Sequence, residues 1–331
     1  MEKFFKLSER GTTVKIEMTA GITTFFAMVY ILMVNANMFA NPFGNGTNVL
    51  GVSYGAIYIA TAISAIVGTV LIGLLANLPL AQASGMGLNA FFCTCFVSGA
   101  FFAGEDVMTG YHSGLVVIFL SGIVFLILSI TGLREYIAKA MPDCLKKAIP
   151  AGIGLFIAFI GLQNAGVVVN SDATLIVLGD ITTGPALLAM VGLIITGFLY
   201  AKNVPGAMLI GIMATTLIGI PMGITEFKGV FSQPQSIADI FCQFQWDNIF
   251  TMDMLVVVFT MLFMDLFDTV GSLVGVCTKS GMINKDGSIS RINEAFMADA
   301  VATTAGACLG TCTTTTYVES ASGVAIGGRS G

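Results

Sequence analysis

The sequence has very little charge. Lys, Arg, Asp and Glu together make up 10% of its 331 residues, whereas hydrophobic residues make up 56%. A soluble domain carries about a quarter charged residues, so this chain cannot cover a water-facing surface. The scarcity of charge excludes an ordinary soluble domain. It predicts an all-α polytopic membrane protein with the lipid bilayer as its surroundings and no nucleic-acid partner.

Histidine is nearly absent, and cysteine follows no site pattern. His112 is the single histidine, which excludes a histidine metal cluster. The seven cysteines are odd in number and mostly lie inside apolar runs, which is not a disulfide framework. Cys93–Cys95 and Cys308–Cys312 lack the spacing of a metal site. With no apparent nucleophile–base pair either, we expect no metal, no cofactor and no enzyme activity.

What the chain has instead is a series of apolar runs, most of them near the length of about 20 residues that crosses a bilayer. They predict about ten spans. The predicted spans cover 19–39, 54–75, 85–102, 113–130, 149–162, 184–200, 205–220, 254–277, 295–309 and a last one that begins near Glu319. The third is short and rich in glycine, and polar loops at 41–46 and 163–183 separate other spans.

The basic residues are distributed unevenly between the predicted loops. If the N-terminus lies in the cytoplasm and each segment crosses once, every Lys and Arg except Lys228 falls on the cytoplasmic side. Cytoplasmic loops carry an excess of Lys and Arg. We therefore predict a multi-pass protein of the plasma (inner) membrane with its N-terminus in the cytoplasm.

Residues 221–250 are the least hydrophobic long stretch and divide the chain into two parts. Ile237, Ile240, Phe241 and Phe244 recur there at helical spacing, which predicts an interfacial amphipathic helix. The predicted organisation is a cytoplasmic N-terminus at 1–18, a first repeat of spans 1–7 at 19–220, the linker at 221–250, and spans 8–10 at 251–331.

The third and tenth segments resemble each other. PLAQASGMGLNAFF and TCTTTTYVESASGV both have an extended approach of small residues, and both place a polar residue, Asn89 or Glu319, near a helix start. The copies lie an odd number of crossings apart, so the second is inverted. Paired broken segments in inverted repeats are typical of secondary transporters, although two unrelated re-entrant pieces remain the alternative. The second copy stops after its third span, so we expect a C-terminally truncated chain.

Acidic residues inside the spans indicate a site. Asp265 and Asp268 lie three residues apart in MDLFDTVGSLVGV, and ionisable groups at bilayer depth are costly. We expect Asp268 and Glu319 to face a ligand, while Asp265 is either a proton-coupling group or a structural partner between helices. Asn89 suits a neutral heterocycle or a cross-helix hydrogen bond equally well. For Asp299, a structural hydrogen bond is the expected role.

The chemistry of these residues favours a particular kind of ligand. Carboxylates and an amide without Lys or Arg would repel anions but suit a cation or a neutral molecule rich in N–H donors, such as a planar base. The aromatic residues nearby are either stacking groups for such a base or ordinary packing. They are Phe25, Phe26, Phe91, Phe92 and Tyr317.

Four motifs carry a family resemblance. EMTAGITTFFAMVYILMVNANM, ASGMGLNAFF, MDLFDTVGSLVGV and TTTYVESASGVAIGGRSG resemble the nucleobase–cation symporter-2 family, in particular its AzgA-like branch of hypoxanthine, guanine and adenine permeases. The resemblance implies a seven-plus-seven inverted repeat, of which about ten of fourteen spans are present. It also implies short antiparallel strands before the two broken helices, proton symport of purine nucleobases and often a homodimer.

The resemblance also implies the site. Asp268 and Glu319 match the family's two substrate-holding acids, and Asn89 matches its polar position in the third segment. The predicted substrate-binding residues are Glu319, Asp268, Asn89, Gly87, Leu88, Tyr317 and Phe25, and the predicted proton-coupling residues are Asp268, Glu319 and Asp265. The alternatives are an anion exchanger of the same fold, or a channel.

Overall fold

Helices make up most of the structure, a computed structural model that describes residues 2–40, 50–97, 106–140, 142–171, 173–202, 204, 207–225, 233–247, 249–282, 289 and 291–331. The chain divides into two units. The first comprises Met1–Ile153 and Pro234–Gly331, and the second comprises Gly154–Gln233. The residues that the sequence predicts to form a site all belong to the first unit.

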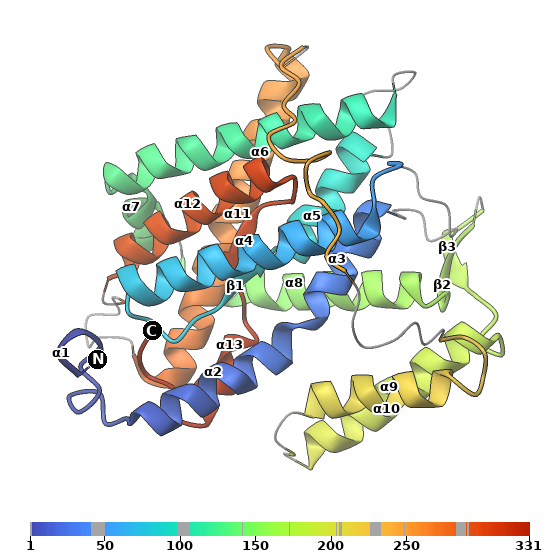
Figure 1. The fold of residues 1–331 in the computed structure, drawn as a ribbon, viewed down its shortest axis with the longest axis horizontal. Coiled ribbons are helices and arrows are strands. Elements are labelled where there is room, and N and C mark those ends of the chain that lie inside the picture. The colour runs from blue at the N-terminus through green and yellow to red at the C-terminus, as the bar shows by residue number, and fades with distance from the viewer. Residues whose placement is uncertain are drawn as a thin grey trace. The chain divides into compact units, whose positions relative to one another are not determined.

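The first unit contains most of the helices and one pair of strands (Figure 1). Up to residue 153 they are α1 (Glu2–Phe5), α2 (Val14–Met28), α3 (Tyr30–Ala40), α4 (Tyr54–Leu75), β1 (Gln82–Ser84), α5 (Met86–Phe92), a π-helical turn (Cys93–Val97), α6 (Val107–Ile130), α7 (Leu133–Ala140) and the start of α8 (Asp143–Asn164). After residue 234 they are α11 (Met252–Ser280), α12 (Ile292–Leu309), β4 (Thr314–Thr316) and α13 (Ser320–Ala325).

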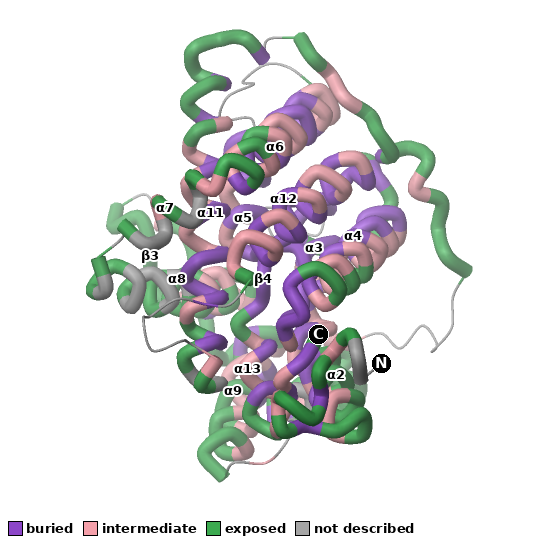
Figure 2. Tube along the Cα trace, turned by 90° about the vertical axis from the view of Figure 1, so that its left-hand side faces the viewer, coloured by how far each residue is buried: buried purple, intermediate pink, exposed green. Residues whose placement is uncertain are grey.

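Small residues let the central helices approach closely. α12 packs against both α4 and α6, and the three run alongside one another in Figure 1. A methyl group on Gly122 of α6 would lie 2.5 Å from the Thr304 Oγ1 of α12. One on Gly306 of α12 would lie 3.1 Å from the Ser64 Oγ of α4. Close backbone approach through such residues is how membrane helices associate, and the buried residues gather along these helices in Figure 2.

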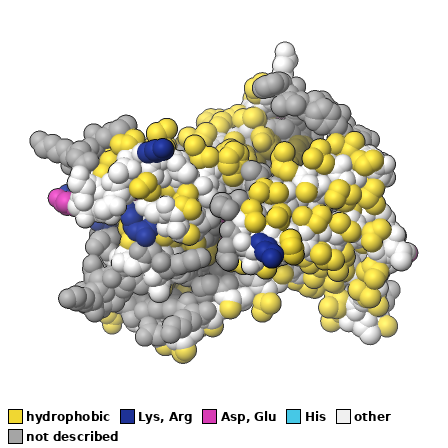
Figure 3. Space-filling view, turned by 90° about the horizontal axis from the view of Figure 1, so that it is seen from below, with side chains coloured by type: hydrophobic (Ala, Val, Ile, Leu, Met, Phe, Trp, Pro, Cys, Tyr) yellow, Lys and Arg dark blue, Asp and Glu magenta, His cyan; other side chains and the backbone are white. Residues whose placement is uncertain are grey.

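Among the described residues on the face seen in Figure 3, hydrophobic side chains cover wide areas and few charged side chains lie among them. Among the described residues, five helices are long and apolar enough to cross a membrane: Val14–Ala40, Tyr54–Leu75, Val107–Ile130, Gly184–Ala201 and Met252–Thr278. The predicted span at 54–75 has the bounds of α4, and the span predicted at 113–130 begins six residues earlier, at Val107.

The strand prediction is confirmed. β1 pairs antiparallel with β4, with Gln82 opposite Thr316 and Ser84 opposite Thr314. Each strand is followed directly by a short helix, α5 or α13. Two segments far apart in the sequence therefore meet through backbone hydrogen bonds.

The predicted amphipathic helix over 237–244 is wrong. Turns and backbone without regular secondary structure occupy this stretch instead. Ile240 is buried against Gly310 at the end of α12, and the Cys242 N–H donates to the Cys308 carbonyl at 2.7 Å. Because these contacts hold individual residues against α12, the helical spacing of the apolar residues does not produce a helix.

The second unit contains the end of α8, β2 (Val168–Ser171), β3 (Leu175–Leu178), α9 (Gly184–Ala201) and α10 (Ala207–Gly219). The stretch 163–183, predicted as a loop, includes an antiparallel hairpin of β2 and β3. Its β-branched Val168–Val169 and Ile176–Val177 favour strands. Lys228, the one basic residue outside the predicted cytoplasmic side, lies outside the described residues. Between β3 and α9, Asp180 is exposed, and hydrogen bonds from Thr182 lower its carboxyl pKa.

A group of charged and polar residues, here called the N-terminal cluster, ties chain segments together at the start of α2. It consists of Arg10, Glu17, Asn77 and Arg329. The Arg10 guanidinium donates to the carbonyl oxygens of Asn77 and Arg329, each at 2.6 Å. Glu17 accepts from the backbone N–H groups of Arg329 and Ser330 at 2.9 and 3.1 Å. Burial lowers the pKa of Arg10, with a further contribution from Arg291, while Glu17 and Glu9 act in the opposite direction.

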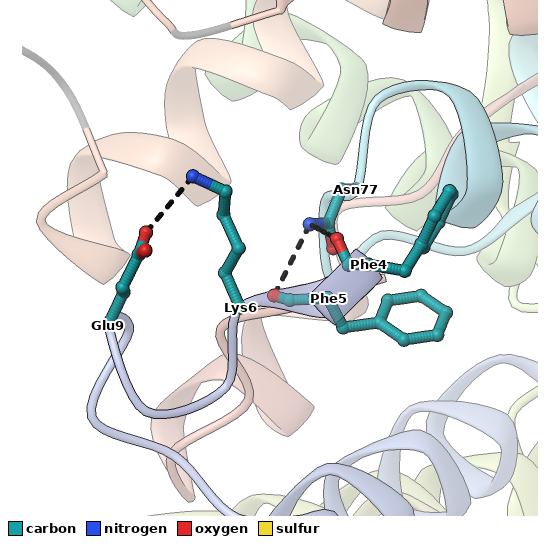
Figure 4. Close-up of polar contacts among 5 residues, drawn as sticks. All are labelled: Phe4, Phe5, Lys6, Glu9 and Asn77. Atoms are coloured by element: carbon teal, nitrogen blue, oxygen red, sulfur yellow. Dashed lines mark hydrogen bonds and ion pairs between the residues drawn. The ribbon is translucent and has the colours of Figure 1, made fainter. Parts of the chain in front are cut away.

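Figure 4 shows how α1 joins this cluster. The side-chain amide of Asn77 donates to the carbonyl oxygens of Phe5 at 3.3 Å and Phe4 at 3.5 Å. Lys6 and Glu9 form an ion pair of 3.1 Å beside it, with side chains that are mostly exposed. The N-terminal residues are therefore connected to the turn that follows α4.

Candidate functional site

β1 and β4 form an antiparallel pair, here called the crossing of β1 and β4. This pair brings the third and tenth segments of the sequence together in the first unit. Beyond the paired residues, the Gly85 N–H donates to the Thr313 carbonyl and the Tyr317 N–H donates to the Ala81 carbonyl, both at 3.0 Å. Because the strands are antiparallel, α5 and α13 leave the crossing from opposite ends. An irregular backbone inside a membrane needs such internal partners.

The threonines of β4 hydrogen-bond to three neighbouring helices and to β1. Thr314 Oγ1 and Ser64 Oγ of α4 are 2.5 Å apart, and the Thr314 carbonyl accepts from Thr303 of α12 at 3.0 Å. Thr315 and Thr269 of α11 share a hydrogen bond of 3.1 Å. The Gln82 side chain donates to Thr316 at 3.3 Å. The threonine run in the sequence therefore supplies the polar partners that water would supply elsewhere.

Asp268 and Glu319 come together at this crossing. A methyl group on Gly85 would lie 3.5 Å from the Asp268 Oδ2, which places this carboxylate beside the turn between β1 and α5. Glu319 immediately precedes α13 and comes two residues after Tyr317, whose hydroxyl donates to the Ser84 carbonyl at the same turn. Asp268 and Glu319 are half-buried, so neither is sealed in the protein interior. The two acids expected to hold a ligand thus share one location, although their roles remain predictions.

Asp299 and Asp265 are more deeply buried than the other two acids. Asp299 accepts from the Thr269 hydroxyl through both carboxylate oxygens, at 3.0 and 3.1 Å. This agrees with the structural hydrogen bond expected for it. Asp265 lies one helical turn before Asp268 and is 1% exposed.

Sequence reasoning missed Tyr30. This residue begins α3, after the helix of the first span is interrupted at Val29, and its hydroxyl donates to the Glu319 Oε1 at 2.5 Å. Its only signal in the sequence is that it is the single phenol in an apolar run. Its partner lies 289 residues later, so spacing within the span could not identify it.

Asn89 takes part in a polar network rather than in the acid pair. Its side-chain amide donates to the Asn35 Oδ1. Asn35, a second residue that sequence reasoning missed, donates to the Thr61 hydroxyl at 2.7 Å and to the Thr311 hydroxyl at 2.9 Å. The structure therefore realises the cross-helix hydrogen bond, one of the two roles expected for Asn89. The neighbouring Gly87 is half-buried, and Leu88 is part of the hydrophobic core.

Three of the aromatic residues expected near the site have different surroundings in the structure. The Tyr317 hydroxyl donates to the Ser84 carbonyl, so it joins the two crossing segments. Phe92 is fully buried and packs on Phe39, with ring centroids 5.3 Å apart. Phe25 is 53% exposed and lines an apolar cavity of about 430 Å³ between α2 and α4, whose lining residues do not include Asp268 or Glu319. Phe25 is therefore not brought to the acids in this structure.

Comparison with known proteins places the chain in a family. A model of the Permease family (Xan_ur_permease) matches residues 15–330. The chain belongs to the Permease family. This confirms the resemblance drawn from the sequence motifs and, together with the apolar helices, makes this permease an integral membrane transporter rather than an enzyme.

The relatives whose alignments cover the whole chain include two bacterial permeases. The guanine/hypoxanthine permease PbuG of Bacillus subtilis is 40% identical over 336 residues, which are 100% of this chain and 74% of that protein. The adenine permease AdeP of Escherichia coli is 36% identical over 331 residues, which are 100% of this chain and 71% of that protein.

A solved structure shares the fold. The transmembrane domain of the cyanobacterial bicarbonate transporter BicA aligns with a TM-score of 0.63 and covers 96% of this chain and 78% of that chain. The two sequences are 15% identical, so the likeness concerns the fold alone.

Proposed function

We propose that this permease carries purine nucleobases, with hypoxanthine, guanine and adenine as candidates, across the plasma membrane together with protons. The observation that carries the proposal is the meeting of Asp268 and Glu319, both half-buried, at the crossing of β1 and β4. Hydrogen bonds to an ionised acceptor are strong, and a nucleobase presents several N–H donors in one plane. The names of PbuG and AdeP supply the substrate class.

Proton coupling in this proposal belongs to the same acids. A carboxyl group that exchanges a proton at the site links the occupancy of the site to the proton gradient. Glu319 and Asp268 are the leading groups, and Asp265, one turn earlier on α11, is the third. Both Asp268 and Glu319 lie where a base would enter, whereas Asp299 is held by Thr269.

The transport cycle follows from the proposed architecture. Helices α5 and α13 each follow a short strand, and they leave the β1–β4 pair in opposite directions. This arrangement supports a seven-plus-seven inverted repeat in which the substrate binds between the two broken segments. The asymmetry of Lys and Arg in the sequence favours a cytoplasmic N-terminus. A homodimer remains part of the proposal through the family resemblance alone.

The proposal is tested by uptake into proteoliposomes that contain this chain. We expect saturable uptake of labelled hypoxanthine, guanine or adenine that rises with an inward proton gradient and collapses with a protonophore. Xanthine and uracil serve as competitors that define the base preference. Uptake that does not depend on the proton gradient would contradict proton coupling. If the chain neither binds nor transports any purine, the proposed function is contradicted.

An anion exchanger of the same fold is the alternative, and the fold shared with a bicarbonate transporter keeps it open to test. The acid pair argues against it, because two carboxylates repel an anion. Bicarbonate movement by this chain in the same proteoliposomes would favour the exchanger.

A further inference from the structure

The contact between Tyr30 and Glu319 joins the first span to the segment that follows β4. Tyr30 follows the interruption of the first span at Val29, and Glu319 follows β4. Their oxygens are 2.5 Å apart, which is the length of an O–H···O⁻ hydrogen bond to an ionised acceptor. A phenol from the first span is therefore placed on the acid of the tenth segment.

Other contacts already hold the surrounding elements in place. α13 packs on α2, and Gly323 fits so closely that a methyl group there would lie 2.2 Å from the Thr24 Oγ1. The Arg329 side chain, at the far end of α13, donates to the Val324 and Gly328 carbonyls at 2.8 and 2.7 Å. The Tyr30 hydroxyl thus acts on the Glu319 carboxylate rather than as the attachment of α13.

We propose that Tyr30 is a positioning residue that holds Glu319 in the orientation in which it accepts an N–H of the base. A carboxylate has about four acceptor sites, so one hydrogen bond from a phenol leaves capacity for a base donor. The phenol fixes the rotation of the carboxylate before the base arrives, which lowers the cost of ordering on binding. This inference rests on the proposed function and adds a determinant of affinity to it.

The test compares Tyr30→Phe with the wild type in proteoliposomes. Phe keeps the ring and removes the donor. We expect the KM for hypoxanthine to rise about tenfold, which corresponds to about 1.4 kcal/mol, while the maximal rate stays within about twofold. Tyr58→Phe is the matched control, because Tyr58 is a half-buried tyrosine of α4 whose ring packs on Tyr54, and its KM should not change.

A second readout separates positioning from a merely structural role. Hypoxanthine has two N–H donors, one at N1 and one on the imidazole ring. Methylation at N1 removes the first, and methylation at N7 or at N9 removes the second. In the wild type, the methyl group that blocks the N–H accepted by Glu319 lowers affinity more than the others. In Tyr30→Phe the loss of affinity caused by that methyl group becomes smaller, because the misaligned Glu319 carboxylate no longer accepts the N–H of the base. The losses caused by the other methyl groups stay the same.

Several outcomes would overturn the inference. They are an unchanged KM in Tyr30→Phe, a loss of maximal rate with KM unchanged, or an equal loss for every analogue. If Tyr30→Phe does not fold, Glu319→Asp, which withdraws the carboxylate from the phenol, must show the same selective loss. If the wild type binds purines and any of these results is found, only the inference about Tyr30 is contradicted. If the wild type binds no purine, both the proposed function and the inference are contradicted.

Discussion

The crossing of β1 and β4 and the N-terminal cluster hold their charged side chains in different ways. At the crossing, Glu319 accepts from the Tyr30 hydroxyl and Asp299 accepts from the Thr269 hydroxyl. In the N-terminal cluster, Arg10 donates to two carbonyl oxygens, and Glu17 accepts from two backbone N–H groups. The first arrangement uses side chains that can reorient, and the second uses the backbone itself.

This difference indicates that the crossing and the N-terminal cluster have different roles, one in ligand binding and the other in stability. Hydroxyl partners stabilise a carboxylate without neutralising its charge, so a ligand that brings N–H groups or a proton still gains by binding. Backbone partners fix the positions of the segments that carry them. We therefore expect changes at the crossing to affect transport most, and changes in the N-terminal cluster to affect stability most.

The largest expected effect is at Glu319. Glu319→Gln keeps the size of the side chain but removes its charge and its exchangeable proton. Concentrative uptake should fall by at least about 100-fold, which corresponds to about 2.7 kcal/mol. The measurement is proton-driven uptake of labelled hypoxanthine. Glu9→Gln, at an exposed position outside the spans, is the control, and full proton-driven uptake by Glu319→Gln would contradict the role of the crossing.

The next comparison sets Asp268 against Asp299. Asp268→Asn should raise the KM for the base by about 10- to 100-fold, because a bond to a charged acceptor is worth about 1.5–3 kcal/mol. Asp299→Asn should instead lower the unfolding free energy by about 1–3 kcal/mol, because an amide nitrogen replaces one of the oxygens that accept from Thr269. Thermal unfolding and uptake kinetics on both variants separate the two effects, and equal changes in both would show that the acids share one role.

A third comparison tests how closely α13 must fit. Gly323→Ala would place a methyl group 2.2 Å from the Thr24 Oγ1 and 2.6 Å from the Ala20 carbonyl oxygen. Overpacking of this kind costs about 1–3 kcal/mol, and it should also reduce uptake several-fold because α13 follows Glu319. Gly21→Ala on α2 is the matched control, since a methyl group there meets no atom within 4 Å. A stable, active Gly323→Ala would show that α13 is free to shift.

Local sequence patterns predicted the elements whose partners are lipid or near neighbours. The run at 54–75 has the bounds of α4 because Ser53 and the Asn77–Pro79 turn enclose it. The extended character of the threonine run predicted β4, whereas the antiparallel strands were implied by the family resemblance and not by a local pattern. The acids Asp268 and Glu319 were identifiable because charge inside an apolar run is costly.

Long-range contacts account for what the sequence could not predict. Tyr30 and Asn35 read as ordinary residues of a span. The Tyr30 partner Glu319 and the Asn35 partner Thr311 lie hundreds of residues away. The spacing at 237–244 fits a helix, but burial of Ile240 under α12 overrides it. In each case the deciding contact joins elements whose arrangement no local pattern records.

The smallest effects on transport are expected outside the spans, where Arg10 and Lys6 make contacts of different kinds within one short segment. Arg10→Ala removes two hydrogen bonds of 2.6 Å that join the turn after α4 to the segment after α13. Allowing for its partial exposure, we expect a loss of about 1–3 kcal/mol of unfolding free energy, with the KM for the base unchanged.

Lys6→Ala removes only the ion pair with Glu9, whose side chains are 55% and 70% exposed. Exposed pairs contribute about 0–1 kcal/mol and are screened by salt, so the thermal midpoint should hardly move. The ratio of the two effects tests whether backbone contacts, rather than charge as such, make the N-terminal cluster an anchor. Equal losses that both disappear at high salt would mean that the cluster is held by surface electrostatics alone.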